Sequence, residues 1–157
     1  MVNDTAKSFD RVSYILSEIP FFEDFSDEEL VLFSNQLSLR LFPEQSCLFK
    51  KDDVGDYLVF IVNGKLDVRL ESNDKKQMII ASFGPGNTVG EMSLIDDYPR
   101  SATVVVTEPS ELLLLSRKRF DEICSSNPVI GLKFLRGLAQ NLSVRLRKTN
   151  GRFADFD

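Results

Sequence analysis

The sequence predicts an α+β domain made mainly of β-structure: an antiparallel β jelly-roll barrel flanked by N-terminal helices and a long C-terminal helix. Residues 39–116 consist of short apolar, β-branched runs separated by turn residues, with no helical periodicity between most of them. Apolar residues recur at helical spacing before and after this region. A chain of 157 residues with 43% apolar residues can bury a substantial core, and we expect a single domain.

Two helices are expected before the barrel. Residues 8–19 repeat apolar side chains at helical spacing, and Pro20 ends this helix. Ser26 and Glu29 have the spacing of a capping box, in which each side chain bonds to the backbone N–H of the other residue. A second helix therefore begins after Ser26, and we expect it to continue through Leu37.

The region between the helices contains the strands. We expect them near 39–42, 46–50, 57–63, 65–71, 77–83, 101–108 and 110–116. Asn63-Gly64 and Ser72-Asn73-Asp74 are typical of hairpin turns, because asparagine and glycine readily adopt positive φ. Residues 90–99 then form the longest excursion between strands, and long loops are where binding residues usually lie.

Two further helices are expected after the barrel. Ser116 can cap a short helix over 117–125, and Asn127-Pro128 places a cap before a proline at the first helical position. This last helix should run to about Lys148. Three leucines follow heptad spacing along it: Leu135, Leu138 and Leu142. Two interpretations stay open, since this face either packs on the barrel of its own chain or forms a dimer seam.

The composition excludes several classes of function. The chain contains no histidine, which rules out metal binding through imidazole and histidine-based acid–base catalysis, so we expect no catalytic residue and no metal site. Cys47 and Cys124 lack the spacing of a metal or redox motif and are expected as free thiols. The sequence has neither an 18-residue apolar run nor a signal peptide, so we expect a cytoplasmic protein without a transmembrane segment.

Residues 90–104 combine the parts of an anion-binding pocket. Gly90 allows positive φ, and a helical turn behind it would present free backbone N–H groups to an anion. Arg100 can bind two phosphate oxygens at once, whereas Glu91 repels phosphate and is suited to a sugar hydroxyl. If the next strand begins at Pro99, Arg100 lies on its interior face and must pair with Glu91 or an anion. The alternatives are a surface turn in which Glu91 and Arg100 pair, or Arg100 in water at the strand mouth.

This motif also carries a family resemblance. Gly90-Glu91-Met92-Ser93-Leu94, followed five residues on by Pro99-Arg100-Ser101-Ala102-Thr103, resembles the phosphate-binding cassette of the cyclic-nucleotide-binding domain family. The family includes bacterial catabolite activators, regulatory subunits of cyclic-AMP-dependent kinase and cyclic-nucleotide-gated channels. The resemblance implies a phosphate-binding loop at 84–103. The family usually has glycine where this chain has Gln45 and Asp52, which predicts that those two turns are reshaped.

The resemblance implies a cyclic mononucleotide as ligand, cyclic AMP or cyclic GMP, and no cofactor. Its phosphate is expected at the backbone amides near Gly90, Met92 and Ser93 and at the side chains of Arg100 and Ser101. Its ribose 2′-hydroxyl is expected at Glu91. Ser101 is compatible with either base, and we favour cyclic AMP.

The last helix is expected to contact the base. Counting without gaps from Asn127-Pro128, the family's base-contacting position falls on Arg145, which can stack on a purine or donate to it. The alternative is an exposed arginine that complements the helix C-terminus. Residues 128–152 hold six basic and no acidic side chains in a chain of net charge −5. Contact with nucleic acid or an anionic membrane is one interpretation, and a solvated helix face is the other.

The sequence does not identify the partner through which the domain would pass on a signal. Transcriptional members of the family continue into a helix-turn-helix domain, and we expect no DNA-binding domain here because few residues follow the last helix. The expected partner is a second copy, through the C-terminal helix, or an unidentified effector protein, unless the chain is part of a longer protein. Two functions are considered: a regulatory cyclic-nucleotide-binding module that moves its C-terminal helix, and a ligand-independent interaction or dimerisation module on the same fold.

These assignments divide the domain into four consecutive parts. Residues 1–38 form the N-terminal helices, and residues 39–116 form the barrel with the loop 84–103. Residues 117–150 form the C-terminal helices, and residues 151–157 are expected as a loose tail.

Overall fold

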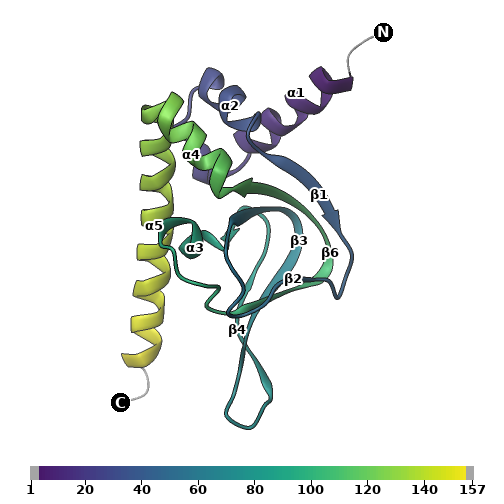
Figure 1. The fold of residues 1–157 in the computed structure, drawn as a ribbon, viewed down its shortest axis with the longest axis vertical. Coiled ribbons are helices and arrows are strands. Elements are labelled where there is room, and N and C mark those ends of the chain that lie inside the picture. The colour runs from purple at the N-terminus through teal and green to yellow at the C-terminus, as the bar shows by residue number, and fades with distance from the viewer. Residues whose placement is uncertain (1–3, 155–157) are drawn as a thin grey trace.

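The computed structural model describes residues 4–154, and the side chains of residues 11–151. Helices α1, α2 and α4 lie at one end of a curved β-roll, and the long helix α5 runs along its side (Figure 1). In chain order the elements are α1 (Asp4–Ser17), η1 (Pro20–Phe22), α2 (Asp27–Ser34), β1 (Ser38–Phe42), β2 (Cys47–Phe49), β3 (Tyr57–Glu71), β4 (Gln77–Phe83), β5 (Thr88–Val89), α3 (Glu91–Ile95), β6 (Thr103–Ser116), α4 (Arg117–Ser126) and α5 (Pro128–Ala154).

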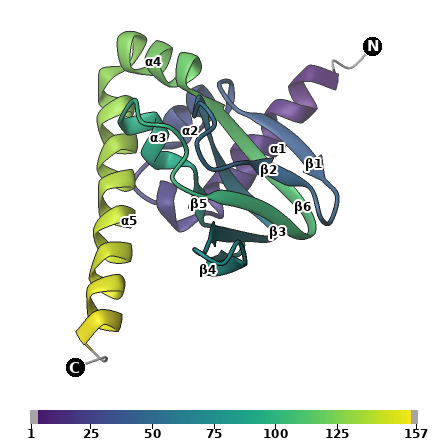
Figure 2. The same cartoon turned by 60° about the horizontal axis from the view of Figure 1, so that its bottom comes forward.

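The strands form one six-stranded sheet that curls on itself. Its order is β1-β6-β3-β4, while β2 pairs with β6 and β5 pairs with β3. Every one of these pairings is antiparallel. The short strand β5 was not expected from the sequence, because two residues are too few for an alternating pattern. Figure 2 shows that β5 and α3 lie on the side of the roll that faces α5. The expected antiparallel β-roll with flanking helices is confirmed.

The expected hairpin at Asn63-Gly64 is wrong. β3 continues through both residues and pairs with β6 on either side, with register shifts between Ile61 and Leu66. Gly64 has φ 102, and a Cβ there would lie 2.0 Å from the Oγ of Ser110. The glycine therefore allows a bulge and a close approach of β6, and the two strands bend together as long ribbons. The other expected turn is present, since Ser72 and Lys76 close the hairpin between β3 and β4 with a backbone hydrogen bond of 2.8 Å.

The turns at Gln45 and Asp52 keep a backbone conformation that favours glycine. Their φ values are 71° and 72°, in the left-handed region. The prediction that the side chains would reshape these turns is therefore wrong. An L-residue in this region costs about 1–2 kcal/mol, and aspartate tolerates it better than glutamine does.

The N-terminal helices follow the sequence signals closely. The capping box is formed, since Ser26 Oγ accepts from the N–H of Glu29 (3.2 Å) and Glu29 Oε1 accepts from the N–H of Ser26 (3.0 Å). α2 ends at Ser34, so the expected continuation to Leu37 is wrong. α1 begins at Asp4, before the expected residue 8.

The C-terminal helices begin as expected. Ser116 caps α4 by accepting from the N–H of Arg119 at 3.2 Å. α5 begins at Pro128, but it extends past Lys148 to Ala154 and is about 40 Å long. Residues 151–154 are therefore helical, contrary to the expected loose tail, and residues 155–157 lie outside the described residues.

A cluster of phenylalanines, which we call the aromatic hub, joins the helices to the roll. Its members are Phe21, Phe22, Phe25, Phe33, Phe60, Phe120 and Phe134, with neighbouring ring centroids 4.9–6.0 Å apart. Phe134 of α5 is fully buried there. A second cluster, which includes Val59, Ile61, Leu66 and Leu112, fills the roll itself. The hub thus fixes where α5 starts its path across the roll.

The three heptad leucines of α5 do not behave alike. Leu138 is fully buried against the same chain, whereas Leu135 is 39% exposed and Leu142 is half-buried. Leu132 and Leu146 are also exposed. The interpretation of packing on the same chain therefore holds for Leu138, and an apolar stripe remains on the outer side of the helix.

Candidate ligand-binding site

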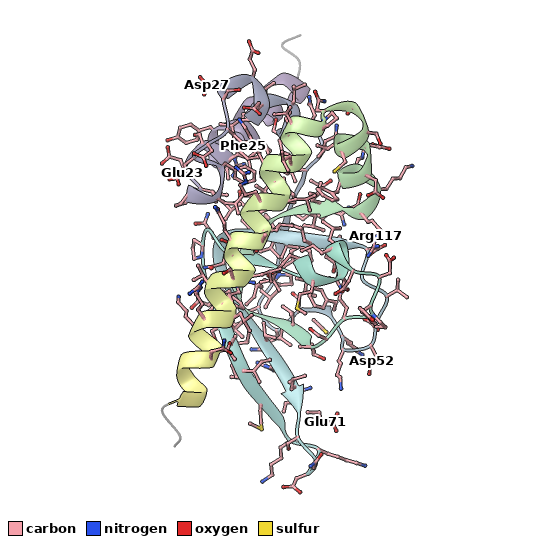
Figure 3. All side chains as sticks on the ribbon, turned by 90° about the vertical axis from the view of Figure 1, so that its left-hand side faces the viewer. Glu23, Phe25, Asp27, Asp52, Glu71 and Arg117 are labelled. Carbon is pink, nitrogen blue, oxygen red and sulfur yellow. The ribbon has the colours of Figure 1, made fainter. Side chains whose placement is uncertain are left out.

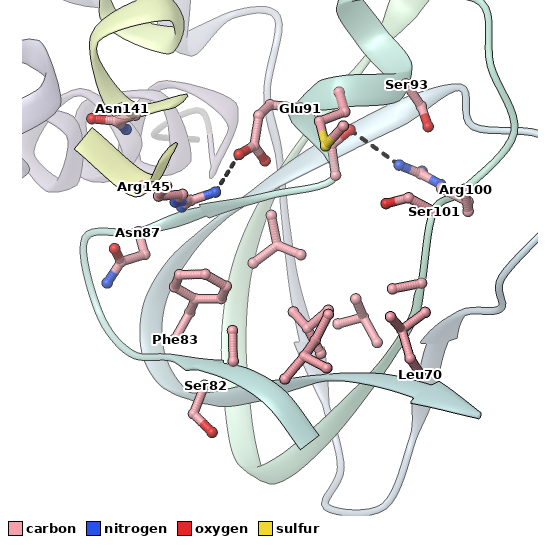
Figure 4. A pocket seen from close by; sticks show the side chains of 18 of the residues that line it. Leu70, Ser82, Phe83, Asn87, Glu91, Ser93, Arg100, Ser101, Asn141 and Arg145 are labelled. Atoms are coloured by element: carbon pink, nitrogen blue, oxygen red, sulfur yellow. Dashed lines mark hydrogen bonds and ion pairs between the residues drawn. The ribbon is translucent and has the colours of Figure 1, made fainter. Parts of the chain in front are cut away.

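A pocket of about 830 Å³ lies between the roll and the C-terminal half of α5 (Figure 4). Val68 and Leu70 of β3 and Ile80 of β4 belong to its apolar wall, and α3 and the start of β6 form its polar end. Asn141 and Arg145 reach it from α5. Its volume and mixed lining are typical of small-molecule sites.

Gly90 sets the shape of the polar end. It has φ 89 and precedes α3, the single helical turn expected from the sequence. A Cβ at this position would lie 2.7 Å from Nη1 of Arg100 and 3.2 Å from the carbonyl oxygen of Tyr57. Both the backbone conformation and the space therefore require glycine. As the N-cap residue, Gly90 has no side chain that could cap the N–H groups of the first turn of α3.

Arg100 is buried at the floor of this end, with only 2% of its surface exposed. Nη1 donates to the carbonyl oxygen of Gly90 (3.1 Å), Nη2 donates to that of Tyr57 (2.7 Å), and the guanidinium lies 3.8 Å from the ring centroid of Phe49. Its Nε–H is buried and has no partner among the described residues. Arg100 is therefore buried as expected, and the alternative of an arginine in water is wrong. The expected strand start at Pro99 is also wrong, because β6 begins at Thr103 and Arg100 lies before it.

Arg100 does not pair with Glu91, which was one of the two partners considered for it. Glu91 is 3% exposed and forms an ion pair with Nη1 of Arg145, which comes from α5. Nη2 of Arg145 donates to the carbonyl oxygen of Thr88 (2.6 Å), and its guanidinium lies 4.3 Å from the ring centroid of Phe83. Figure 4 shows the two arginines on opposite sides of α3. The reason is tertiary, since the path of α5 across the pocket brings Arg145 closer to Glu91 than Arg100 is.

Burial shifts the ionisation of both buried charges. Burial raises the pKa of Glu91, and the positive charge of Arg145 opposes this shift. Burial also lowers the pKa of Arg100 from a value far above neutral, while nearby Tyr57 opposes the change. An arginine remains charged in such an environment. The pocket therefore contains a permanent cation, Arg100, and a separate carboxylate, Glu91, that burial makes costly to ionise.

The structure brings all seven expected site residues to this one pocket. Gly90, Glu91, Met92 and Ser93 line it from the α3 segment, Arg100 and Ser101 from the segment before β6, and Arg145 from α5. Met92 and Ser101 are exposed, whereas Ser93 is buried. Arg145 therefore faces the pocket and is not a free arginine at the end of the helix.

Sequence reasoning missed three residues around the pocket. The ring of Phe83 lies against the guanidinium of Arg145, and Asn141 of α5 lines the pocket. Arg117 donates a hydrogen bond to the carbonyl of Ser93 in α3. The positions of Phe83 and Asn141 depend on the fold, and no local pattern marks them. Arg117 had a signal, because a basic residue directly after an N-cap serine is unfavourable for its own helix.

Metal and membrane signals are lacking in the described part of the chain. Within it, no group of three acidic or cysteine side chains is arranged to hold a metal ion. No helix in residues 4–154 is both long and apolar enough to cross a bilayer.

Fold and site together define a ligand-binding domain: an antiparallel β-roll with a buried arginine in its pocket and a long helix over the mouth. Residues 39–127 match the family model of the cyclic nucleotide-binding domain. The chain belongs to this family, as the motif at Gly90 to Thr103 had suggested.

The chain is similar to parts of two longer proteins. The chain is 31% identical over 131 residues to the cyclic AMP receptor protein of Thermus thermophilus, covering 83% of this chain and 59% of that protein. It is 32% identical over 124 residues to a cyclic nucleotide-gated potassium channel of Rhizobium etli, covering 79% of this chain and 33% of the channel. The chain thus spans between one third and three fifths of the length of these two relatives.

Among solved structures, a cyclic nucleotide-binding domain from Methylobacillus flagellatus has a TM-score of 0.84 and 32% identity. That comparison covers 99% of this chain and 88% of the other chain. The whole of the described fold is therefore found in another member of the family.

Proposed function

We propose that this domain binds a cyclic mononucleotide, cyclic AMP in preference to cyclic GMP, and signals by moving α5. The observation that carries the proposal is the convergence in one pocket of Arg100, the uncapped first turn of α3 and the buried carboxylate of Glu91. A ribose cyclic phosphate presents one anionic group and one hydroxyl a few ångströms apart, which complements this arrangement.

The phosphate would lie at the polar end of the pocket. The N–H groups of the α3 segment and the side chain of Arg100 are donors there, and Ser101 can add a hydroxyl. The unpaired Nε–H of Arg100 shows that this guanidinium has hydrogen-bonding capacity left after its contacts with Gly90 and Tyr57. The base would extend along the apolar wall formed by Val68 and Leu70.

The contact between Glu91 and Arg145 supplies the switch. A ribose hydroxyl that bonds to Glu91 competes with Arg145, so ligand entry releases α5 from its present position. Arg145 would then be free to stack on the purine. Ligand shifts the helix only by binding the two positions with different affinity.

Calorimetric titration of nucleotide-free protein with cyclic AMP and cyclic GMP tests the proposal. We expect saturable heat with cyclic AMP and weaker binding of cyclic GMP. Arg100→Ala should lower the affinity at least about tenfold, because a hydrogen bond to a charged group contributes about 1.5–3 kcal/mol. Lys118→Ala, at an exposed position outside the pocket, serves as the control. Absence of heat at millimolar nucleotide in folded protein would sink the proposal.

A second function is favoured by the outer face of α5. Leu132 and Leu146 are 60% and 61% exposed, and with Leu135 they follow heptad spacing. A ligand-independent dimerisation module would use this stripe. Sedimentation distinguishes the two functions, since a stable dimer in protein that gives no heat with either nucleotide would favour the second.

A further inference from the structure

Arg117 occupies a position that its own helix does not favour. It is the first residue of α4, directly after the N-cap Ser116. A positive charge in the first turn is unfavourable because the free N–H groups there already carry positive partial charge. α4 nevertheless begins with Arg117, Lys118 and Arg119, and its first turn contains no acidic residue. The side chain of Arg117 is therefore placed for something other than the stability of α4.

The guanidinium of Arg117 reaches the far end of α3. Its partners are the carbonyl oxygens of Ser93, Gly55 (3.1 Å) and Asp96 (3.3 Å), and it forms an ion pair with the carboxylate of Asp97. Carbonyl groups at the C-terminal end of a helix favour a cation. The side chain of Arg117 therefore extends away from the N-terminus of α4, where its charge is unfavourable, to the C-terminal end of α3, where a positive charge is favourable. Figure 3 shows Arg117 on the side of the roll next to α4.

α3 lies directly between Arg117 and the pocket. It has five residues, and its first turn borders the pocket while its last carbonyls accept from Arg117. Ser93 and Arg100 are packed closely around Gly55, where an added Cβ would lie 2.2 Å from Cβ of Ser93 and 3.1 Å from Nε of Arg100. A shift of α3 on ligand binding therefore displaces the acceptors that hold Arg117.

α4 in turn packs against α5. Phe120 of α4 lies with its ring centroid 5.5 Å from that of Phe134 of α5, inside the aromatic hub. The backbone N–H of Arg117 also donates to the carbonyl of Asp56 at 2.7 Å, so the start of α4 is held at two points near α3. A continuous set of contacts runs from α3 through Arg117 and α4 to the buried part of α5.

We propose that Arg117 is a positioning residue that transmits occupation of the pocket from α3 to α4 and from there to α5. This inference rests on the proposed function, because it assumes that a nucleotide contacts α3. It adds a second route to α5, separate from the Glu91–Arg145 contact, and it assigns the new role to a residue that does not line the pocket.

Amide hydrogen exchange with and without saturating cyclic AMP tests this role, with calorimetry on the same samples. In the wild type we expect cyclic AMP to change exchange both in α3 and in α4. In Arg117→Gln, saturated with nucleotide, the change in α3 should persist and the change in α4 should be lost. Arg117→Lys should give an intermediate change in α4, since an ammonium group is a point charge and cannot span all these acceptors. Lys118→Gln removes a neighbouring exposed charge and should respond like the wild type.

The outcomes separate the two proposals. A full wild-type response of α4 in Arg117→Gln overturns the inference, while bound nucleotide in calorimetry leaves the proposed function intact. If Arg117→Gln does not fold, a full response of α4 in Arg117→Lys overturns it instead. A purely structural role would lower the melting temperature in both variants and leave the response of α4 to nucleotide unchanged. Wild-type protein that binds no cyclic nucleotide overturns the proposed function, and the inference with it.

Discussion

The two halves of α5 are held to the roll by different kinds of contact. In the first half, Ile130, Phe134 and Leu138 are spaced four residues apart and buried in the hydrophobic core. In the second half, the hydrogen bonds from described side chains to the roll are those of Arg145, to Glu91 and Thr88. Apolar burial is not directional and has no competitor in the pocket, whereas a hydrogen-bonded ion pair can be replaced by a ligand hydroxyl. One continuous helix therefore combines a permanent attachment with an exchangeable one.

Removing the permanent attachment should have the largest effect. Phe134→Ala deletes a fully buried ring that contacts Phe21, Phe33, Phe60 and Phe120. We expect the free energy of unfolding to fall by about 3–5 kcal/mol, measured by urea denaturation. Val129→Ala, at a position 64% exposed, should change it by less than about 0.5 kcal/mol. A cost for Phe134→Ala similar to that of Val129→Ala would contradict the assignment of the first half as the anchor.

Removing the exchangeable attachment should act locally. Arg145→Ala leaves the buried carboxylate of Glu91 without its partner, at a cost of about 1–3 kcal/mol. Amide exchange should become faster in residues 141–151 and stay unchanged in residues 128–138. Arg147→Ala removes an exposed charge two residues further along α5 and should change neither region. Equal acceleration in both halves of α5 would show that they are not held separately.

The smallest expected effect is on the pH dependence of stability, and it tests the environment of one residue, Glu91. Burial raises the pKa of Glu91 above its ordinary value of 4.5, so the folded protein binds this proton more tightly than the unfolded chain. The stabilisation is complete below pH 4.5 and is lost as pH rises through the folded-state pKa. Glu91→Gln does not titrate at this position. Relative to this variant, the free energy of unfolding of the wild type should fall between pH 4.5 and the folded-state pKa of Glu91 and stay constant above it. Urea denaturation of both proteins over a pH series measures the difference. A wild type that gains stability over the interval would mean that Arg145 outweighs burial.

Local signals in the sequence were sufficient for the site's backbone. Gly90, the single turn of α3 and the caps at Ser26 and Ser116 were predicted, because each depends on residues only a few positions apart. These turns and caps need no knowledge of the rest of the fold. Arg100 is buried as expected, but the strand alternation used to predict this does not apply, because β6 begins at Thr103 and Arg100 lies before it.

Contacts between distant segments could not be predicted from these local sequence signals. Glu91 and Arg145 are 54 positions apart, and their pairing depends on where the aromatic hub places α5. Asn63-Gly64 has the sequence of a hairpin turn, but pairing with β6 along its whole length keeps β3 continuous there. In both cases the tertiary arrangement overrides what the neighbouring residues favour on their own.

The position of the aromatic hub along α5 makes the helix a lever with unequal arms. Phe134 is close to the start of α5, and the remaining helix to Ala154 extends about 30 Å beyond it. If α5 moves as proposed above, the buried ring contacts of Phe134 hold the start of the helix and are the point about which the rest of it would turn. A rotation of about 10° there would carry the far end of the helix about 5 Å. Exposed Leu146 lies on this long arm, so the proposed movement of α5 would displace it farther than the residues near Phe134.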